Sequence, residues 1–427
     1  MKNQEEIENL TALYNEGNYK ELKEQAIRLL KSNENNYEAL NALAIAYKHL
    51  GESGNAKETF LKLVNSGLKS DYIYSNAGNF FYDIGNINTA VQCHKHAIKL
   101  NPKNLNSLNQ IGMALSNMGN DKEAIDYYKR ALDIDNKLEG AHHNIANSYR
   151  NLKDYSEASA HYEESKLNLS KCQQLECLYH LNEKENFYKK LKIQSEFYSP
   201  HPLAACLSAH AAVRYDMDDN YSFCKTPFKF IQKLNLYDKS DFDDSYIEDF
   251  FRCFNDQNID KKEQSLLKNG YQSSGNIFLI QEEPIQRIKN IILDKIESYK
   301  RLYKSTGATV ISKWPKNYTL YGWLIVMNKG GNLGGHMHKE GWLSGSIYLA
   351  RPIKQEKEDG DIIFSLHGSN YPQEGKSFPS KVLEIEKGDM VLFPSSIFHA
   401  TLPFDADEKR ITLAFDIIPN SEKAILN

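Results

Sequence analysis

The residues of this sequence best suited to chemistry are two histidines, His336 and His338, in the segment GGHMHKEG. In a β-strand, side chains two positions apart point to the same face, so these two imidazoles would be directed at a common point. A third histidine, His399, follows in the segment FPSSIFHATLPF. Imidazole nitrogens are common ligands of iron, zinc and copper, so the three histidines together predict a metal site.

The histidines lie in a region whose pattern is typical of short β-strands. After about residue 315, apolar and polar residues alternate, and turn signals such as Lys387-Gly388 separate the runs. We expect eight strands, at 319–328, 333–338, 342–350, 361–366, 381–386, 389–394, 398–403 and 409–418. So many short strands in a compact region predict a closed or double-sheet structure of the jelly-roll type.

The order of these motifs resembles that of the 2-oxoglutarate- and iron(II)-dependent oxygenases. The family has an H-x-[D/E] motif, a distant histidine and an R-x-[S/T] motif; this chain has His336 and His338, then His399, then Arg410 and Thr412. The segments HMHKEGWLSGSIYLARP, GDIIFS, GDMVLFPSSIFHATLPF and KRITLAF are similar to those of a 2-oxoglutarate oxygenase family that is often joined to tetratricopeptide repeats. The resemblance is good over residues 320–418.

The resemblance implies an Fe(II)-dependent dioxygenase that uses 2-oxoglutarate as co-substrate, hydroxylates a C–H bond and releases succinate and CO2. His336, His338 and His399 would hold the iron on one face and leave the other face open. Arg410 would bind the far carboxylate of 2-oxoglutarate, because the fork of a guanidinium suits a carboxylate better than an ammonium group does. The Thr412 hydroxyl would be a second donor on the same strand face.

One position departs from the family pattern, because His338 stands where an aspartate is usual. Three interpretations remain open. In the first, three histidines hold the iron. In the second, His336 and His399 hold it alone, as in the aspartyl/asparaginyl β-hydroxylases, which also join tetratricopeptide repeats to an oxygenase barrel. In the third, Glu340, which shares the strand parity of His336, supplies the carboxylate.

Two other functions are compatible with these residues. A cupin-type metalloenzyme that does not use 2-oxoglutarate would have similar glycine and histidine motifs, although it would not need Arg410. A repeat scaffold with an inactive barrel is suggested by His338. A structural zinc site is disfavoured, because such sites are rich in cysteine and no cysteine follows Cys253.

The first 170 residues repeat with a period of 34. One column holds Gly17, Gly51, Gly85, Gly119 and Lys153; a second holds Leu10, Ala44, Gly78, Gly112 and Ala146; a third holds Phe60, His94, Tyr128 and Tyr162. The period and columns resemble the tetratricopeptide repeat, which implies five antiparallel helix pairs at 3–36, 37–70, 71–104, 105–138 and 139–172. The small residues would let the helices approach, the aromatic residues would fill the gap, and the glycines would end each first helix.

Stacked repeats of this kind present a concave groove. We therefore expect the repeats to bind a protein or peptide, either as a partner or as the substrate. The alternative interpretation is a module for self-association or a spacer.

These patterns predict a multidomain α + β chain with three parts. An α-solenoid of repeats would occupy residues 1–172, and a helical capping and linker region would occupy residues 173–310. A double-stranded β-helix, or jelly-roll, barrel would form the oxygenase core at residues 311–427.

The composition limits the partners and the cellular compartment to be expected. The chain is 41% hydrophobic and 25% charged, with a net charge of -4, which is ordinary for a globular protein. No basic block argues for nucleic acid, and no apolar run is long enough to span a membrane. The six cysteines form no C-x-x-C pair, so we expect free thiols and a cytoplasmic location.

Overall fold

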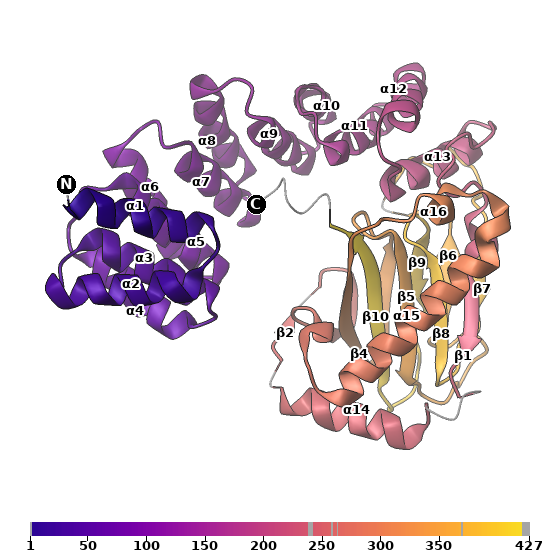
Figure 1. Cartoon of the computed structure of the whole chain (residues 1–427). Helices are drawn as coiled ribbons and strands as arrows, with labels where there is room; N and C mark the ends of the chain where they lie inside the picture. Colours follow the sequence, from indigo (N-terminus) through magenta and orange to yellow (C-terminus); the bar gives the residue numbers. More distant parts are fainter. Residues whose placement is uncertain (1, 238–241, 258, 263, 369, 421–427) are drawn as a thin grey trace. The chain divides into compact units, whose positions relative to one another are not determined.

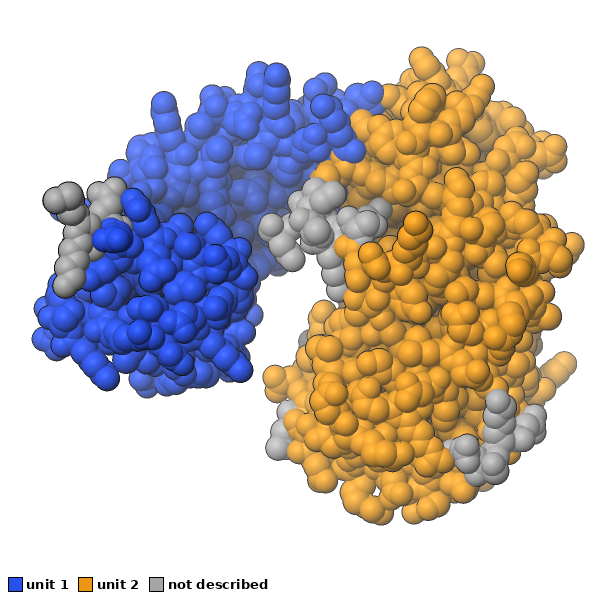
Figure 2. Space-filling view, viewed as in Figure 1, with its two compact units in different colours: residues 1–166 blue, residues 167–427 orange. Residues whose placement is uncertain are grey.

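The computed structural model describes residues 2–237, 242–257, 259–262, 264–368 and 370–420. Residues 421–427 of the predicted third domain thus lie outside the described residues. Contacts divide the chain into two compact units, residues 1–166 and 167–427 (Figure 2). The division of the chain into three parts stays a prediction.

The first unit is a helical solenoid. Its described residues form α1 (Lys2–Asn15), α2 (Tyr19–Ser32), α3 (Tyr37–His49), α4 (Ser53–Asn65), α5 (Asp71–Asp83), α6 (Ile87–Leu100), α7 (Leu105–Asn117), α8 (Asp121–Ile134), α9 (Glu139–Asn151) and α10 (Tyr155–Glu164). The helices stack in successive pairs (Figure 1). Helices α3, α5, α7 and α9 begin at residues 37, 71, 105 and 139, so the period of 34 read from the sequence is the period of the helix pairs.

The columns of the repeat have the structural roles that the sequence predicts. A Cβ atom on Gly78 would lie 2.5 Å from Nε2 of His94, and one on Gly112 would lie 2.4 Å from the Tyr128 ring, so the aromatic column fills the space left by the small column. Gly119 ends α7 with a φ of 79°, and Lys153 takes a φ of 64° at the matching place after α9. A left-handed residue there lets the chain turn back into the second helix of the pair.

The second unit packs helices around one antiparallel sheet. Its helices are α11 (Asn168–His180), α12 (Lys184–Phe197), α13 (Pro202–Arg214), α14 (Asp244–Asp256), α15 (Glu283–Tyr303) and the short α16 (Thr309–Ser312). Its strands are β1 (Gln232–Asn235), β2 (Lys261–Lys262), β3 (Leu267–Ser273), β4 (Tyr318–His336), β5 (Leu343–Ala350), β6 (Ile362–Ser365), β7 (Ser380–Leu383), β8 (Asp389–Pro394), β9 (Phe398–Thr401) and β10 (Arg410–Pro419). No described helix is long and apolar enough to cross a membrane.

The strands run in the order β1-β8-β5-β10-β4-β9-β6-β7, with β3 also paired to β4 and β2 paired to β3. Strand β4 pairs with β10 along its first half, from Tyr318 to Met327. Its last residues pair with β9 instead, with Leu333 opposite Thr401 and His336 opposite His399. The long β4 therefore connects the two sides of a curved, half-barrel sheet.

The alternation of side chains gives this sheet two different faces. On β10, Leu413, Phe415 and Ile417 point outward into the main hydrophobic core, which includes Ile288 and Ile292 of α15. Helix α15 lies along that outer face (Figure 1). The residues between them, such as Thr412 and Asp416, point to the inner face of the curved sheet. Burial of the outer face against α15 therefore leaves the inner face free to form a site.

Two sequence predictions in this unit are wrong. The strands predicted at 319–328 and 333–338 form one continuous strand, β4, because Gly330 adopts a φ of 72° that shifts the register without ending the strand. The region 173–310, expected to be helical, also contains β1, β2 and β3. These strands are short and mostly polar, so they carry little of the alternation that marks a buried strand.

Acid should weaken the solenoid through His94, which is 1% exposed and contacts the Ser107 hydroxyl at 3.1 Å. Burial lowers the pKa of His94 to about 4, below its value of 6.5 in an unfolded chain. The folded state therefore loses stability relative to the unfolded state as pH falls from 6.5 toward 4, by up to about 3 kcal/mol. The variant His94→Phe should lose less stability over this range, as measured by urea unfolding at pH 7 and pH 4.5.

The matched control is His96→Phe on the same helix, where the histidine is exposed. This control should keep the acid response of the parent protein. If His94→Phe were as sensitive to acid as the parent protein, the buried imidazole would not be the cause.

Candidate metal centre

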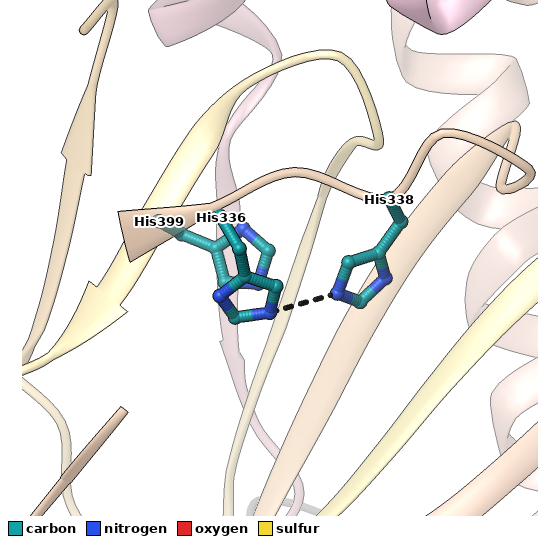
Figure 3. A group of neighbouring side chains, drawn as sticks. All are labelled: His336, His338 and His399. Atoms are coloured by element: carbon teal, nitrogen blue, oxygen red, sulfur yellow. Dashed lines mark hydrogen bonds between the residues drawn. The ribbon is translucent and has the colours of Figure 1, made fainter. Parts of the chain in front are cut away.

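Three histidines of the second unit converge on the inner face of the sheet. His336 is the last residue of β4 and lies opposite His399 of β9, and His338 follows in the next loop (Figure 3). One nitrogen atom from each ring lies within 4.8 Å of the others. In the described part of the chain, this is the only cluster of histidine, cysteine and acidic residues with such a spacing. The three residues that the sequence singles out are thus brought together.

The hydrogen bonds of the rings leave one nitrogen of each directed inward. Nδ1 of His336 lies 2.9 Å from the carbonyl oxygen of Gly334, and Nδ1 of His399 lies 3.4 Å from that of Ile397. Nδ1 of His338 lies 2.7 Å from an Asp416 carboxylate oxygen. Since these oxygens are acceptors, each ring keeps its proton on Nδ1 and presents the lone pair of Nε2.

This arrangement fits a bound cation. The Nε2 atoms of His336 and His338 are 3.2 Å apart, and in the tautomers just described neither carries a proton that could bridge them. Two facing lone pairs repel each other unless a positive ion lies between them. Three imidazoles whose outer nitrogens donate to fixed oxygens are a typical set of transition-metal ligands.

Burial favours the neutral form of His336 and His399, which is the form that binds metal. Burial, with a smaller effect from His338, lowers the pKa of His336 to about 4. Burial also lowers the pKa of His399 well below its usual value. A neutral imidazole has a lone pair to donate, so these two ligands need not lose a proton at neutral pH before a metal binds.

His338 enters the cluster from a loop and not, as the sequence predicts, from a strand. The predicted strand 333–338 ends at His336, so His338 lies in a loop and is not placed by strand parity. Glu340, which the sequence predicts on the same strand face as His336, is exposed and lies outside the cluster of three histidines. Glu340 lines the same cavity as the three histidines, and its role as a ligand stays a prediction.

Arg410 and Thr412 lie on the same inner face, at the start of β10. Arg410 is 2% exposed, donates from Nε to the carbonyl oxygen of Gly360 at 3.0 Å and donates to the Thr412 hydroxyl at 2.8 Å. Its guanidinium also lies 5.0 Å from the centre of the Tyr348 ring. Burial lowers the pKa of Arg410, which reflects how poorly this environment solvates a charge.

No carboxylate of the described residues forms an ion pair with Arg410. The nearby Asp361 pairs instead with Arg351 at 2.6 Å and with Lys354 at 2.9 Å. A buried guanidinium with donors to spare and no anionic partner in the protein is suited to an anionic ligand.

The histidines and Arg410 line one cavity of about 640 Å³. Its lining also includes Tyr321, Trp323, Lys262, Gln264, Gln272 and Asp416. The sequence did not predict Trp323, Lys262, Gln264, Gln272 or Asp416 at the site. For Asp416 the available signal is its spacing of four from Thr412 on one strand, which puts both on the same face.

A three-histidine cluster and a buried arginine lie in one cavity, which is an arrangement suited to the class of metal-dependent enzymes that also bind an anion. Comparison with known families makes the class specific. Residues 321–416 match the family described as "Putative 2OG-Fe(II) oxygenase". Residues 37–66, 72–104, 105–138 and 140–166 match the tetratricopeptide repeat. The chain therefore carries tetratricopeptide repeats followed by a domain of this 2-oxoglutarate/Fe(II) oxygenase family.

Solved structures similar to the chain are repeat proteins. The structure of MamA has 21% identity and a TM-score of 0.34, and the match covers 42% of this chain and 95% of MamA. PilF of Pseudomonas aeruginosa has 17% identity and a TM-score of 0.41, with 46% and 91% covered. YrrB, titled a repeat protein with an unusual peptide-binding site, has 18% identity and a TM-score of 0.33, with 37% and 82% covered. No curated protein matches the chain.

Removal of one histidine should abolish tight metal binding. The variant His399→Ala removes a buried nitrogen from the cluster, and we expect the dissociation constant for Co(II) to rise by at least about 100-fold. Titration of metal-free protein with Co(II), followed by visible absorption, measures this. The control is His96→Ala in the first unit, which should bind Co(II) as the parent protein does. Equal affinity of His399→Ala and the parent protein would exclude the cluster as the metal site.

Proposed function

We propose that this protein is an Fe(II)- and 2-oxoglutarate-dependent dioxygenase that hydroxylates a C–H bond of a protein or peptide. In the reaction, substrate, dioxygen and 2-oxoglutarate give hydroxylated substrate, succinate and CO2. The observation that carries the proposal is one cavity that contains both the inward-facing nitrogens of His336, His338 and His399 and the unpaired guanidinium of Arg410. The family match of residues 321–416 supports it.

In this proposal each residue has a separate role. The three histidines hold the iron from one side of the cavity, and their Nδ1–H groups stay bonded to fixed oxygens, which keeps the ring planes from rotating. When bound, iron and 2-oxoglutarate together supply the oxidising chemistry. Arg410 and Thr412 bind the far carboxylate, and the apolar residues around them, such as Ile362 and Phe393, exclude water from this end of the cavity.

The remaining inner face is the place for the substrate. Tyr321 and Trp323 of β4 line the cavity beside His338, and the Trp323 and His338 rings are 5.8 Å apart. Gln264 and Gln272, from the strands and loops before β4, bring two amide groups to the same cavity. Amides offer both a donor and an acceptor, as a peptide backbone does, so they suit a peptide substrate.

The proposal also includes the predicted barrel and the helices that support it. We propose that residues 311–427 form a double-stranded β-helix core, supported by the helices of residues 173–310. The supporting observation is the exchange of partners along β4, from β10 to β9, by which one strand takes part in both sides of the sheet. Among the described residues no disulfide joins the six cysteines, which is in keeping with a reducing, cytoplasmic compartment.

The repeats serve, in this proposal, as the arm that binds the partner or substrate. A groove of about 380 Å³ in the first unit is lined by residues of α1, α2, α3 and α5, including Leu10, Tyr14, Asn41, Ile45 and Asn76. The Asn76 amide donates to the Asn41 amide oxygen at 3.2 Å, so amide groups border an apolar floor. Such a groove suits an extended peptide with an apolar side chain.

The reaction is tested by succinate release. Metal-free protein is loaded with Fe(II) under anaerobic conditions, mixed with 2-oxoglutarate and exposed to air. Succinate should form in the parent protein and not in His399→Ala. If the parent protein neither releases succinate nor binds 2-oxoglutarate in the presence of metal, this function is wrong.

The role of Arg410 predicts a selective effect of Arg410→Lys. The lysine keeps the charge but loses the fork geometry, and the loss of one charge-assisted hydrogen bond should raise KM for 2-oxoglutarate by about 10- to 100-fold. The affinity for Co(II) should stay unchanged. The matched control is Arg351→Lys, because Arg351 pairs with Asp361 and does not line the cavity. An unchanged KM in Arg410→Lys would contradict the assignment.

The role of the repeats predicts that a charge in their groove reduces modification of peptides. The variant Ile45→Glu should hydroxylate members of a degenerate peptide library at a rate several-fold lower than the parent protein, as measured by mass spectrometry. Succinate release without peptide should stay unchanged, because the reaction centre is untouched. If peptide hydroxylation does not fall, the groove does not bind the substrate.

A further inference from the structure

The loop that carries His338 is attached to the sheet through a buried carboxylate. Asp416 lies on the inner face of β10, opposite Ser344 of β5 and Tyr321 of β4. It is 7% exposed, and its two oxygens lie 2.7 and 2.9 Å from Nδ1 of His338. It also accepts a hydrogen bond of 2.6 Å from the Ser344 hydroxyl.

The surroundings hold Asp416 in one place. The Ser344 hydroxyl is 2.7 Å from the Ser395 hydroxyl, and the His338 amide donates to the Ser395 carbonyl oxygen at 3.2 Å. A Cβ atom on Gly341 would lie 2.7 Å from the Ser395 hydroxyl and 3.3 Å from the Asp416 carboxyl carbon, so the loop passes close over this group. Two hydroxyls and a tightly packed loop thus fix the carboxylate behind the His338 ring.

Among the described residues, Asp416 forms one ion-pair contact, and its partner is Nδ1 of His338 rather than a lysine or an arginine. A buried carboxylate without lysine or arginine is costly unless its neighbours donate hydrogen bonds. The hydrogen bond to Asp416 also fixes the orientation of the His338 ring. Since His338 lies past the end of β4, no strand pairing fixes its ring as it does those of His336 and His399.

We propose that Asp416 is a positioning residue that makes His338 a metal ligand, and that it supplies from behind His338 the negative charge usually supplied by a ligand aspartate. This inference rests on the metal site of the proposed function. A carboxylate that accepts from the outer nitrogen of a ligand histidine orients the ring and makes its inner nitrogen a stronger donor. The negative charge then lies one residue further from the metal.

The proposal makes residues 338 and 416 depend on each other. In His338→Asp alone, a ligand carboxylate would lie next to the Asp416 carboxylate, and the two like charges would repel each other. In the double variant His338→Asp/Asp416→Asn, the amide of residue 416 can donate to the new carboxylate. The second substitution should therefore restore metal binding that the first removes.

The experiment is a Co(II) titration of metal-free full-length protein, followed by visible absorption. We expect Asp416→Asn to raise the dissociation constant by about 10- to 100-fold and to change the absorption bands, because the ring of His338 is no longer held. His338→Asp should bind more weakly than the parent protein by a similar factor. His338→Asp/Asp416→Asn should bind more tightly than His338→Asp.

The matched control is Asp389→Asn, which makes the same change at a buried aspartate of β8, a strand that β5 separates from β10 in the sheet. Asp389 bonds to Asn235 and the Glu386 amide, away from the histidines. This control should bind Co(II) like the parent protein. Circular dichroism of each variant, and the thermal midpoint without metal, separate loss of the ligand from loss of the fold.

Two results would overturn the inference. One is an Asp416→Asn variant with the affinity and spectrum of the parent protein. The other is a His338→Asp variant that binds as tightly as the parent protein while Asp416 is intact. In both cases the proposed function survives if His399→Ala still abolishes binding and succinate still forms. If His399→Ala also binds like the parent protein, the metal site itself is wrong.

Discussion

The site depends on one cross-strand pairing, that of His336 on β4 with His399 on β9. Opposed residues of neighbouring strands hold their side chains at a fixed, short separation, and here the two ring centres are 4.4 Å apart. Loops alone would not fix a buried and a half-buried imidazole so closely against their preference for water. The pairing exists because β4 continues through Gly330 rather than ending there, so that its last residues reach a different partner strand.

Because side chains alternate between the two faces of the sheet, one face stabilises the fold and the other face carries the site. Outward residues of β4, β5 and β10 meet α15 in the main core, and that burial holds the sheet together. The inward residues are thereby free to be polar, and β10 uses them at a spacing of two: Arg410, Thr412, Ala414 and Asp416. One strand thus brings to the same cavity both the anion-binding arginine and the carboxylate behind His338. Any slip of its register by one residue would turn all of these groups into the apolar core.

How much of this could be read from the sequence depends on whether the information is local. The 34-residue columns predict the helix pairs, because the contact of Gly78 with His94 recurs in the next pair as that of Gly112 with Tyr128. The histidines and Arg410 were found because each stands in a recognisable motif. The role of Gly330 was not predicted, since the sequence does not distinguish a glycine that bends a strand from one that ends it. Asp416 was also missed as a site residue, because its contact with His338 spans 78 residues and leaves no local trace.

The charges of the cavity offer a physical account of why a histidine can replace the usual aspartate. The buried charged residues that line the cavity are one cation, Arg410, and one anion, Asp416. These two described residues do not pair with each other. A divalent iron and a doubly charged 2-oxoglutarate would add charges that also cancel. Had residue 338 been an aspartate with Asp416 retained, the cavity would hold an extra buried negative charge close to the first. A neutral imidazole at 338 would leave the carboxylate at 416 to keep this balance, and in the proposed site the hydrogen bond between the two would transmit part of that charge to the metal position.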